Sequence, residues 1–202
     1  MTRDQAAARA CVEELYAAHH AEIHGYLARM VGDDELAADL AQETFVKAYR
    51  AFDTLQDLAM ARAWLYRIAG RTALDELRRR KLIRFVPWAG ETRGTVASAE
   101  ETALRGRLTG ELERALAAIP ERQRMALLLS ELQELNGVEL AAALDTSHDA
   151  ARALLARARE SLRQALAVER ARIATAEARP GADAGRLHLP GRRPRGPGGD
   201  GR

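Results

Sequence analysis

The sequence predicts an all-α protein built from two small helical domains. Apolar residues recur at helical spacing through most of its 202 residues, and no stretch alternates apolar and polar side chains as a strand would. Alanine supplies much of the apolar content and only 4% of the residues are aromatic, which favours closely packed helices over a thick aromatic core. Between the two helical parts the periodicity fades among glycine, serine and proline, so we expect a flexible linker there.

The first expected helix has apolar residues from Val12 to Met30 at helical spacing and stops near Gly32. Asp33 or Asp34 then stands where an N-cap belongs, because its carboxylate can accept the free amide protons of the next first turn. A second helix is therefore expected immediately afterwards.

That second helix is amphipathic. Its polar stripe contains Asp39, Gln42 and Glu43. Its inward positions are Leu36, Leu40, Thr44 or Phe45, and Ala48. The stripe is either an ordinary solvated face or a docking surface for a basic partner.

The third expected helix, from about Ala61 to Lys81, combines aromatic rings with cations. Its rings and first arginines are Trp64, Tyr66, Arg67 and Arg71, and its wholly cationic run is Arg78, Arg79, Arg80 and Lys81. Single-stranded nucleic acid needs this combination, because bases stack on rings while cations hold phosphates. Trp64 also shares an apolar face with Leu65 and Ile68, so a position in the core is equally open.

The second helical part ends in the layout of a helix-turn-helix. Pro120 and the pair Asn136-Gly137 separate shorter helices before it. The expected helices Val138–Leu144 and His148–Leu166 flank a three-residue turn, and Ser147 is placed to cap the second of them. The outward side chains at the start of that helix could then reach base edges or phosphates.

The expected organisation is a first domain at residues 1–82, a linker at 83–107, a second domain at 108–168 and a disordered basic tail at 169–202. Residues 170–202 hold eight arginines and three acidic residues, together with many glycines and prolines that cannot form a core. An arm that binds phosphate is the alternative for this tail.

Other classes of protein are disfavoured. No glycine-rich phosphate loop, nucleophile elbow or cysteine–histidine signature is present, so we expect neither an enzyme nor a small-molecule substrate. His20 and His24 lack a third ligand, and Cys11 is the single cysteine, so no metal site or disulfide is expected. Without a signal peptide or a membrane-spanning apolar run, the protein is expected in the cytoplasm, with no membrane insertion.

Several segments together resemble the extracytoplasmic-function (ECF) sigma factors of bacterial RNA polymerase, in the sigma-70 family. The resembling segments are DLAQETFVKAYRAF, AWLYRIA, ALDELRRR and LAAIPERQRMALLLSELQELNGVELAAAL, and the resemblance spans roughly residues 12–82 and 110–167. It implies that the first domain is a sigma region 2 bundle and the second a region 4 helix-turn-helix. It also implies that the chain directs promoter-specific initiation without a cofactor, because the chemistry belongs to the polymerase.

The resemblance assigns roles to the marked residues. Those expected to dock on the clamp helices of the polymerase's largest subunit are Asp39, Gln42, Glu43 and Val46. Those expected at the −10 promoter element are Trp64, Arg67, Arg71, Arg78, Arg79, Arg80 and Lys81. Those expected at the −35 element are Ser147, His148, Arg152, Ala153 and Arg157. An anti-sigma factor is an expected partner, although no residue of this chain identifies one.

The chain departs from the family pattern in both halves. Gly70 and Arg71 stand where the family usually has arginine and asparagine, and Asp145 and Asp149 replace two glycines of the turn and recognition helix. Leu154 also replaces a basic residue. Two added carboxylates near phosphate weaken affinity for DNA. The rival hypotheses are therefore a helix-turn-helix regulator acting alone and a sigma-like protein-interaction module with weakened DNA binding.

Overall fold

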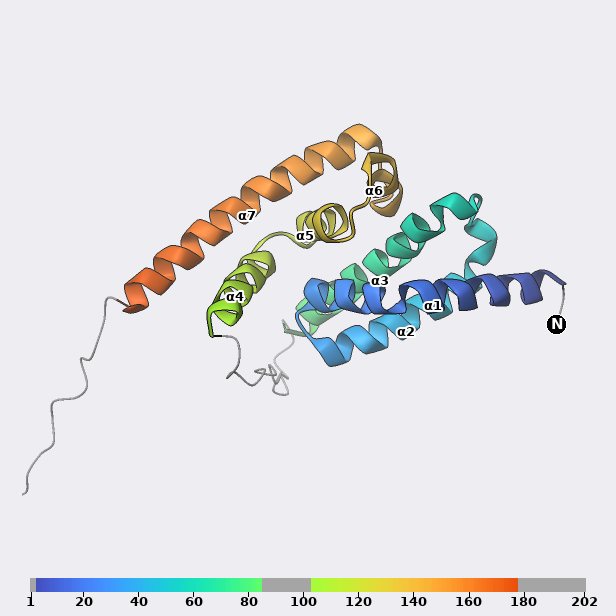
Figure 1. The fold of residues 1–202 in the computed structure, drawn as a ribbon, viewed down its shortest axis with the longest axis horizontal. Helices are drawn as coiled ribbons and strands as arrows, with labels where there is room; N and C mark the ends of the chain where they lie inside the picture. Colours follow the sequence, from blue (N-terminus) through green and yellow to red (C-terminus); the bar gives the residue numbers. More distant parts are fainter. Residues whose placement is uncertain (1–2, 85–102, 178–202) are drawn as a thin grey trace, which may run out of the picture.

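The computed structural model describes residues 3–84 and 103–177, and it confirms the all-α prediction: neither range contains a β-strand. Figure 1 shows one group of helices from the first range and a second group from the other. The α-helices of these ranges are α1 (Arg3–Val31), α2 (Asp34–Arg50), α3 (Ala61–Arg84), α4 (Ala103–Ala118), α5 (Glu121–Leu127), α6 (Gly137–Ala143) and α7 (His148–Glu177).

In the first helical unit, α1–α3, the end of α1 and the start of α2 lie at the predicted signals. α1 ends at Val31, and Gly32 takes a left-handed φ of +72° while its N–H donates to the Ala28 carbonyl at 2.8 Å. Asp33 caps α2, because its carboxylate accepts the N–H of Leu36 at 3.0 Å. The side chains that this unit buries completely include Ile23, Tyr26, Leu27, Met30, Ala37, Ala41, Thr44, Ala48, Leu65 and Tyr66.

The second helical unit, α4–α7, has the predicted helix-turn-helix. Asn136 caps α6 through a reciprocal capping box with Glu139. After α6 the chain turns through Asp145, whose φ is +52°, and Ser147 accepts the N–H of Ala150 at 3.3 Å to start α7. The helix expected between Pro120 and Gln133 is instead α5 followed by a π-helical turn, Leu128–Leu132 (η3).

One predicted helix end differs from the structure. α7 continues to Glu177 instead of ending near Leu166, because Arg170 pairs with Glu111 of α4 at 2.8 Å and a similar pair joins α4 to Glu169. The end of α7 thus overlaps the first residues of the predicted tail, and α4, which begins at Ala103, overlaps the last residues of the predicted linker. The remainder of the predicted linker, 85–102, and of the predicted tail, 178–202, lies outside the described residues.

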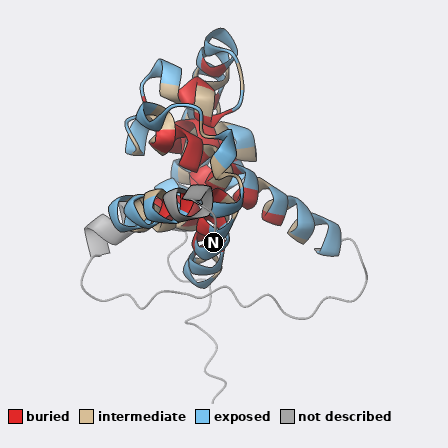
Figure 2. Ribbon diagram, turned by 90° about the vertical axis from the view of Figure 1, so that its right-hand side faces the viewer, coloured by how far each residue is buried: buried red, intermediate tan, exposed pale blue. Residues whose placement is uncertain are grey.

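The two helical units pack against each other. α3 contacts both α5 and α6, and α1 also contacts α5. A single connected cluster of buried apolar side chains extends through both units. Figure 2 shows this buried interior between the exposed outer surfaces of the helices. The sequence pattern contained no sign of this shared core.

Candidate protein and nucleic-acid interfaces

The outer face of α2 presents the four residues predicted to bind a protein partner. Asp39, Gln42 and Glu43 are exposed to solvent, and Val46 is 43% exposed. Glu43 forms an i,i+4 pair with Lys47 at 2.8 Å, which is an exposed pair and contributes little to stability. The opposite side of the helix is buried against α1 and α3. The face therefore has a negative edge beside an exposed apolar side chain.

A groove that the sequence analysis missed lies beside this face, between α1 and α2. It has a volume of about 320 Å³ and is almost wholly apolar. Its lining residues are Arg9, Val12, Glu13, Tyr16, Gln42, Phe45, Val46 and Tyr49. The rings of Tyr16 and Phe45 meet edge to face with centroids 4.9 Å apart, which forms one wall of the groove. The only sequence feature that pointed to this groove was the pair of large rings, Tyr16 and Tyr49. In the structure both lie at solvent-exposed positions of α1 and α2.

Trp64 does not offer the stacking surface predicted for it. Its ring is 4% exposed, and its indole N–H donates to the Thr54 hydroxyl at 3.1 Å. Tyr66, on the same helix, is completely buried as well. Both rings are covered because α3 packs against α1 and α2 on one side and against the second helical unit on the other. They stabilise the core in this conformation and do not face a nucleic acid.

Arg67 and Arg71 of α3 face a carboxylate from the other helical unit. Arg71 Nη2 lies 2.6 Å from Asp145 Oδ2, and Arg67 Nη1 lies 3.9 Å from Asp145 Oδ1. Arg71 is exposed, whereas Arg67 is half-buried. The structure thus brings these two predicted DNA contacts together, but around Asp145 of the helix-turn-helix turn.

The basic run Arg78–Lys81 is not the free cationic patch that the sequence suggested. Each of its residues pairs with a carboxylate. The pairs are Arg78 with Asp75 (2.9 Å), Arg79 with Glu76 (2.7 Å), Arg80 with Glu76 (2.9 Å) and Asp33 (3.5 Å), and Lys81 with Glu121. Acidic residues one turn earlier on α3, and others on neighbouring helices, therefore offset the run's charge.

The start of α7 presents the residues predicted for the −35 element. Those on its exposed surface or in the preceding turn are Ser147, His148, Arg152, Ala153 and Arg157. Ala151 and Ala158 lie on the opposite, inward side of α7 and are completely buried. The Arg152 side chain is 73% exposed and lies 3.8 Å from Asp149.

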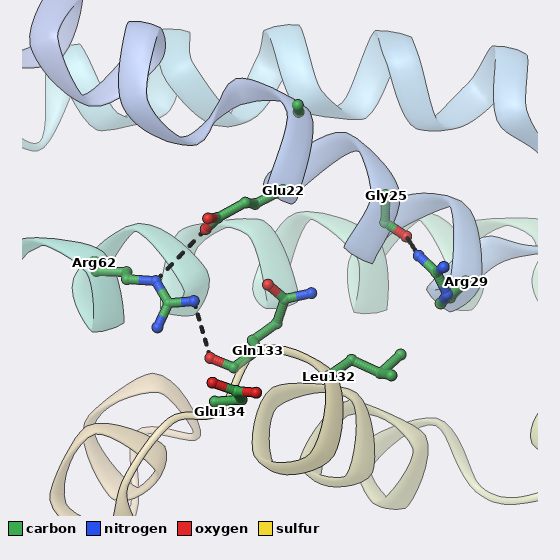
Figure 3. A pocket seen from close by; sticks show the side chains of 8 residues that line it. Glu22, Gly25, Arg29, Arg62, Leu132, Gln133 and Glu134 are labelled. Atoms are coloured by element: carbon green, nitrogen blue, oxygen red, sulfur yellow. Dashed lines mark hydrogen bonds and ion pairs between the residues drawn. The ribbon is translucent and has the colours of Figure 1, made fainter.

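A polar pocket of about 370 Å³ lies where the two helical units meet. Figure 3 shows Arg62 of α3 between Glu22 of α1 and the turn that carries Gln133. Arg62 Nη2 donates to the Gln133 carbonyl at 2.9 Å, and the Tyr66 hydroxyl lies within hydrogen-bond distance of a Glu22 oxygen and of the Gln133 side-chain oxygen, to one of which it donates its proton. Burial, followed by the nearby Glu22 charge, raises the pKa of Tyr66. The pocket is therefore lined by groups that already hydrogen-bond one another.

Two further classes of site are not found in the described part of the chain. No three histidine, cysteine or carboxylate residues of residues 3–84 and 103–177 come together as metal ligands. Within the same ranges no helix combines the length and apolarity needed to cross a bilayer.

Comparison with known families matches each helical unit separately. The family model for sigma-70 region 2 matches residues 15–83, and the one for sigma-70 region 4 matches residues 109–162. The chain is 33% identical to the RNA polymerase sigma factor YlaC of Bacillus subtilis (strain 168), over 77% of this chain and 92% of that protein. It is 31% identical to the ECF RNA polymerase sigma factor SigE of Mycolicibacterium smegmatis, over 82% of this chain and 65% of that one.

Solved structures share the fold. The sigma factor RpoE of Bartonella quintana, crystallised with the anti-sigma factor NepR, superposes with a TM-score of 0.61 at 19% identity, over 77% of this chain and 96% of that chain. CnrH, in complex with the cytosolic domain of CnrY, superposes with a TM-score of 0.56 at 23% identity, over 82% and 97% of the two chains.

Proposed function

Since this chain belongs to the ECF group of sigma-70 family RNA polymerase sigma factors, we propose that it docks on the polymerase core through α2 and brings the enzyme to a subset of promoters. The observation that carries the proposal is the outer face of α2. Asp39 and Glu43 supply negative charge there, and Val46 borders the apolar groove. A helix with basic and apolar residues would find both partners on this surface. The clamp helices of the polymerase's largest subunit are its proposed occupant.

The two helical units divide the recognition of DNA. Residues 1–82 act at the −10 element through α3, where Arg67, Arg71 and the basic run hold the phosphates of the displaced strand. Trp64 is a structural residue of this unit and contributes no stacking in the conformation described. Residues 108–168, continued by the helical extension to Glu177, act at the −35 element.

The start of α7 reads the −35 element in the major groove. Arg152 is the best placed to contact a base edge, because its side chain is long and largely exposed near the start of the helix. Ser147, His148, Ala153 and Arg157 complete this surface. Asp149 lies within this surface, and its negative charge repels nearby phosphates. Binding at the −35 element therefore depends more on base contacts than on attraction to the DNA backbone.

The chain contributes binding and no catalytic group, because RNA synthesis belongs to the polymerase. Its work on chromosomal DNA is carried out in the bacterial cytoplasm. An anti-sigma factor is its expected regulator, since the structurally similar sigma factor RpoE was crystallised with the anti-sigma factor NepR. The α1/α2 groove and the α2 face are the surfaces for which such a partner would compete.

Charge reversal on α2 tests the proposal. Asp39→Arg with Glu43→Arg should abolish co-purification with polymerase core and abolish promoter-dependent transcription in a purified system. The control, Asp53→Arg with Glu113→Arg, makes the same change in charge at exposed positions away from the groove. Unchanged helical circular dichroism in both variants shows that they fold. Core binding retained by the α2 variant, or lost equally in the control, would contradict docking through this face.

A further inference from the structure

Glu76 places a charged side chain on the apolar face of α3. Ala69, Ala73 and Glu76 stand at i, i+4 and i+7, so they share one side of the helix. Both alanines are completely buried, and the Glu76 side chain is only 8% exposed. Carboxylates are rarely buried to this extent unless a partner compensates for the loss of water. A carboxylate at this position therefore requires partners of opposite charge.

Two arginines of the basic run bind the two oxygens of Glu76. Arg79 Nε and Nη2 each lie 2.7 Å from Oε2, and Arg80 Nε lies 2.9 Å from Oε1. Arg79 is exposed and Arg80 is half-buried, so both reach farther into solvent than the carboxylate does. A guanidinium has five N–H donors in a planar fork, so each arginine retains donors on the edge away from Glu76.

A second carboxylate fixes Arg80 from the start of α2. Asp33 Oδ1 accepts the N–H of Leu36 as the N-cap of that helix, which fixes the orientation of the Asp33 carboxylate. The other oxygen, Oδ2, lies 3.5 Å from Arg80 Nη2. The guanidinium of Arg80 is thus held at two nitrogens, by Glu76 and by the cap of α2.

Arg78, at the start of the basic run, lacks this support. Its Nη1 donates to Asp75 at 2.9 Å, but both of these side chains are largely exposed. An exposed pair one turn apart on a helix contributes little and holds its members weakly. The run therefore contains one weakly held arginine and two arginines whose guanidinium groups are anchored on a buried carboxylate.

We propose that Glu76 is a positioning residue for DNA binding, which holds Arg79 and Arg80 as a preformed clamp for phosphates of the displaced strand. The inference rests on the proposed role of α3 at the −10 element. A guanidinium that is already oriented loses less side-chain freedom when it binds a phosphate. Its planar fork also matches two phosphate oxygens, so a fixed orientation gives the contact its direction. Glu76 acts through the two arginines and makes no contact with DNA.

The charge of Glu76 opposes the effect of its geometry. A carboxylate near phosphates repels them, so electrostatics alone predicts that its removal tightens DNA binding. Positioning predicts the reverse, because without Glu76 the arginines have to be ordered when the strand binds. A purely structural role predicts a change in stability without a loss of affinity in the folded variant. The sign of the change in affinity therefore separates these explanations.

Nitrogen-15 NMR of arginine side chains in the full-length free protein tests whether the guanidinium groups are held. The Nε–H protons of Arg79 and Arg80 should exchange with water more slowly than that of Arg78, whose bond to its carboxylate uses Nη1. Replacing each arginine by lysine assigns its signal. Glu76→Gln, which offers one acceptor oxygen, should speed the exchange of at least one anchored proton. Equal exchange rates for the three arginines in wild type would overturn the proposal.

Binding of a fluorescent oligo(dT) 20-mer to the same free proteins tests the clamp. Glu76→Gln should bind about twofold to tenfold more weakly than wild type, although its net charge is more positive. This range is the loss expected when one long side chain has to be ordered on binding. The matched control is Asp75→Asn, which removes the carboxylate one residue earlier on α3 and should bind at least as tightly as wild type.

Three outcomes of the binding experiment would refute the clamp. The first is Glu76→Gln binding as tightly as wild type or more tightly. The second is an equal loss of affinity in Glu76→Gln and Asp75→Asn. The third is a wild-type protein that does not bind the 20-mer even at low salt.

A charge-preserving variant keeps the test decisive if Glu76→Gln does not fold. Arg79→Lys with Arg80→Lys retains both positive charges, but an ammonium group lacks the planar fork. This variant should bind the 20-mer more weakly, with an unchanged slope of log binding constant against log salt concentration because its charge is unchanged. Arg78→Lys is the control and should bind like wild type. Circular dichroism and urea midpoints show which variants fold. Wild-type affinity in the double variant would show that charge alone is sufficient, without a clamp.

Transcription by the wild-type protein with purified core polymerase separates the clamp from the proposed function. If wild type initiates no transcription while the NMR and oligonucleotide results hold, the proposed function is refuted and the clamp stands as a single-strand binding site. If wild type initiates transcription and Glu76→Gln binds the 20-mer like wild type, the proposed function stands and the clamp is refuted.

Discussion

The helices α3 and α7 both carry arginines that the sequence assigns to DNA, yet their surroundings differ. On α7, the Arg152 side chain is 73% exposed, and its neighbouring carboxylate lies one turn away on the same helix. On α3, Arg71 contacts Asp145 of the other helical unit at 2.6 Å, and Glu76, which holds two residues of the basic run, is itself buried. The arginines of both helices thus lie beside carboxylates, but those of α3 meet carboxylates from another helical unit or from a buried side chain, whereas Arg152 meets only an exposed neighbour on its own helix.

The largest effect should come from the ring of α3. Trp64→Ala should lower the free energy of unfolding by about 3–5 kcal/mol, because it leaves a cavity and removes the hydrogen bond to Thr54. Urea denaturation followed by circular dichroism measures the change. Trp64→Phe, which retains most of the volume, should cost much less. Weakened oligonucleotide binding by Trp64→Ala at unchanged stability would show that the ring acts outside the core.

An intermediate effect is expected on α7. Arg152→Ala should weaken binding of the polymerase holoenzyme to its −35 element by about 1–3 kcal/mol, the usual value of a base-edge contact. The stability of the isolated protein should not change, because this side chain is exposed. Footprinting and quantitative binding to mapped promoters measure the effect. An upstream footprint identical to that of wild type would exclude Arg152 as a reader of sequence.

The basic run should contribute less than its charge suggests. Changing Arg78, Arg79 and Arg80 to alanine should make the slope of log binding constant against log salt concentration less steep by less than about 2. A reduction of about 2 is the value for the loss of three single-strand phosphate contacts, at about 0.7 each. The reduction is expected because Asp75 and Glu76 already pair with these arginines. The slope is measured by titration at several salt concentrations. A slope equal to that of wild type would show that these arginines make no contact with DNA phosphates.

The smallest effect concerns the pair between Lys81 and Glu121. The Lys81 hydrogen bond lowers the pKa of Glu121 below its usual value of 4.5. A depressed folded-state pKa means that the pair stabilises the fold above about pH 4.5 and that this contribution is lost as the pH falls through the folded value. Lys81→Gln should therefore lower stability by less than about 1 kcal/mol near neutral pH, since Lys81 is largely exposed.

Urea midpoints measured for wild type and Lys81→Gln between pH 7 and pH 3 provide the check. The difference between the two proteins should shrink as the solution becomes acidic. A difference that stays constant over this range would show that Glu121 is not the carboxylate responsible.

Local signals in the sequence predicted the helices well. Asp33, Ser147 and Pro120 mark helix starts because capping and the missing proline N–H act on residues within one turn. The boundary errors have a different origin. α7 runs on to Glu177, where its residues pair with residues of α4 that lie more than fifty positions earlier in the sequence, and periodicity within α7 could not reveal these pairs.

The candidate surfaces were predictable to differing degrees. The polar stripe of α2 was readable because helix period alone places Asp39, Gln42 and Glu43 on one side. The adjoining groove was not, because it needs Tyr16 of α1 to lie against Phe45 of α2. For Trp64 the helix period left burial open, and only the packing of α3 against neighbours on several sides decided it.

The sequence by itself determined the helices, the helix-turn-helix and the family, since capping, periodicity and motifs depend on residues close together in the chain. Only the tertiary structure decided which cations pair with Asp145 or Glu121 of the other helical unit. The reason is that the partners of a charge can lie far away in the sequence, 74 residues for Arg71 and Asp145, and are brought together by the packing of α3 against the second helical unit.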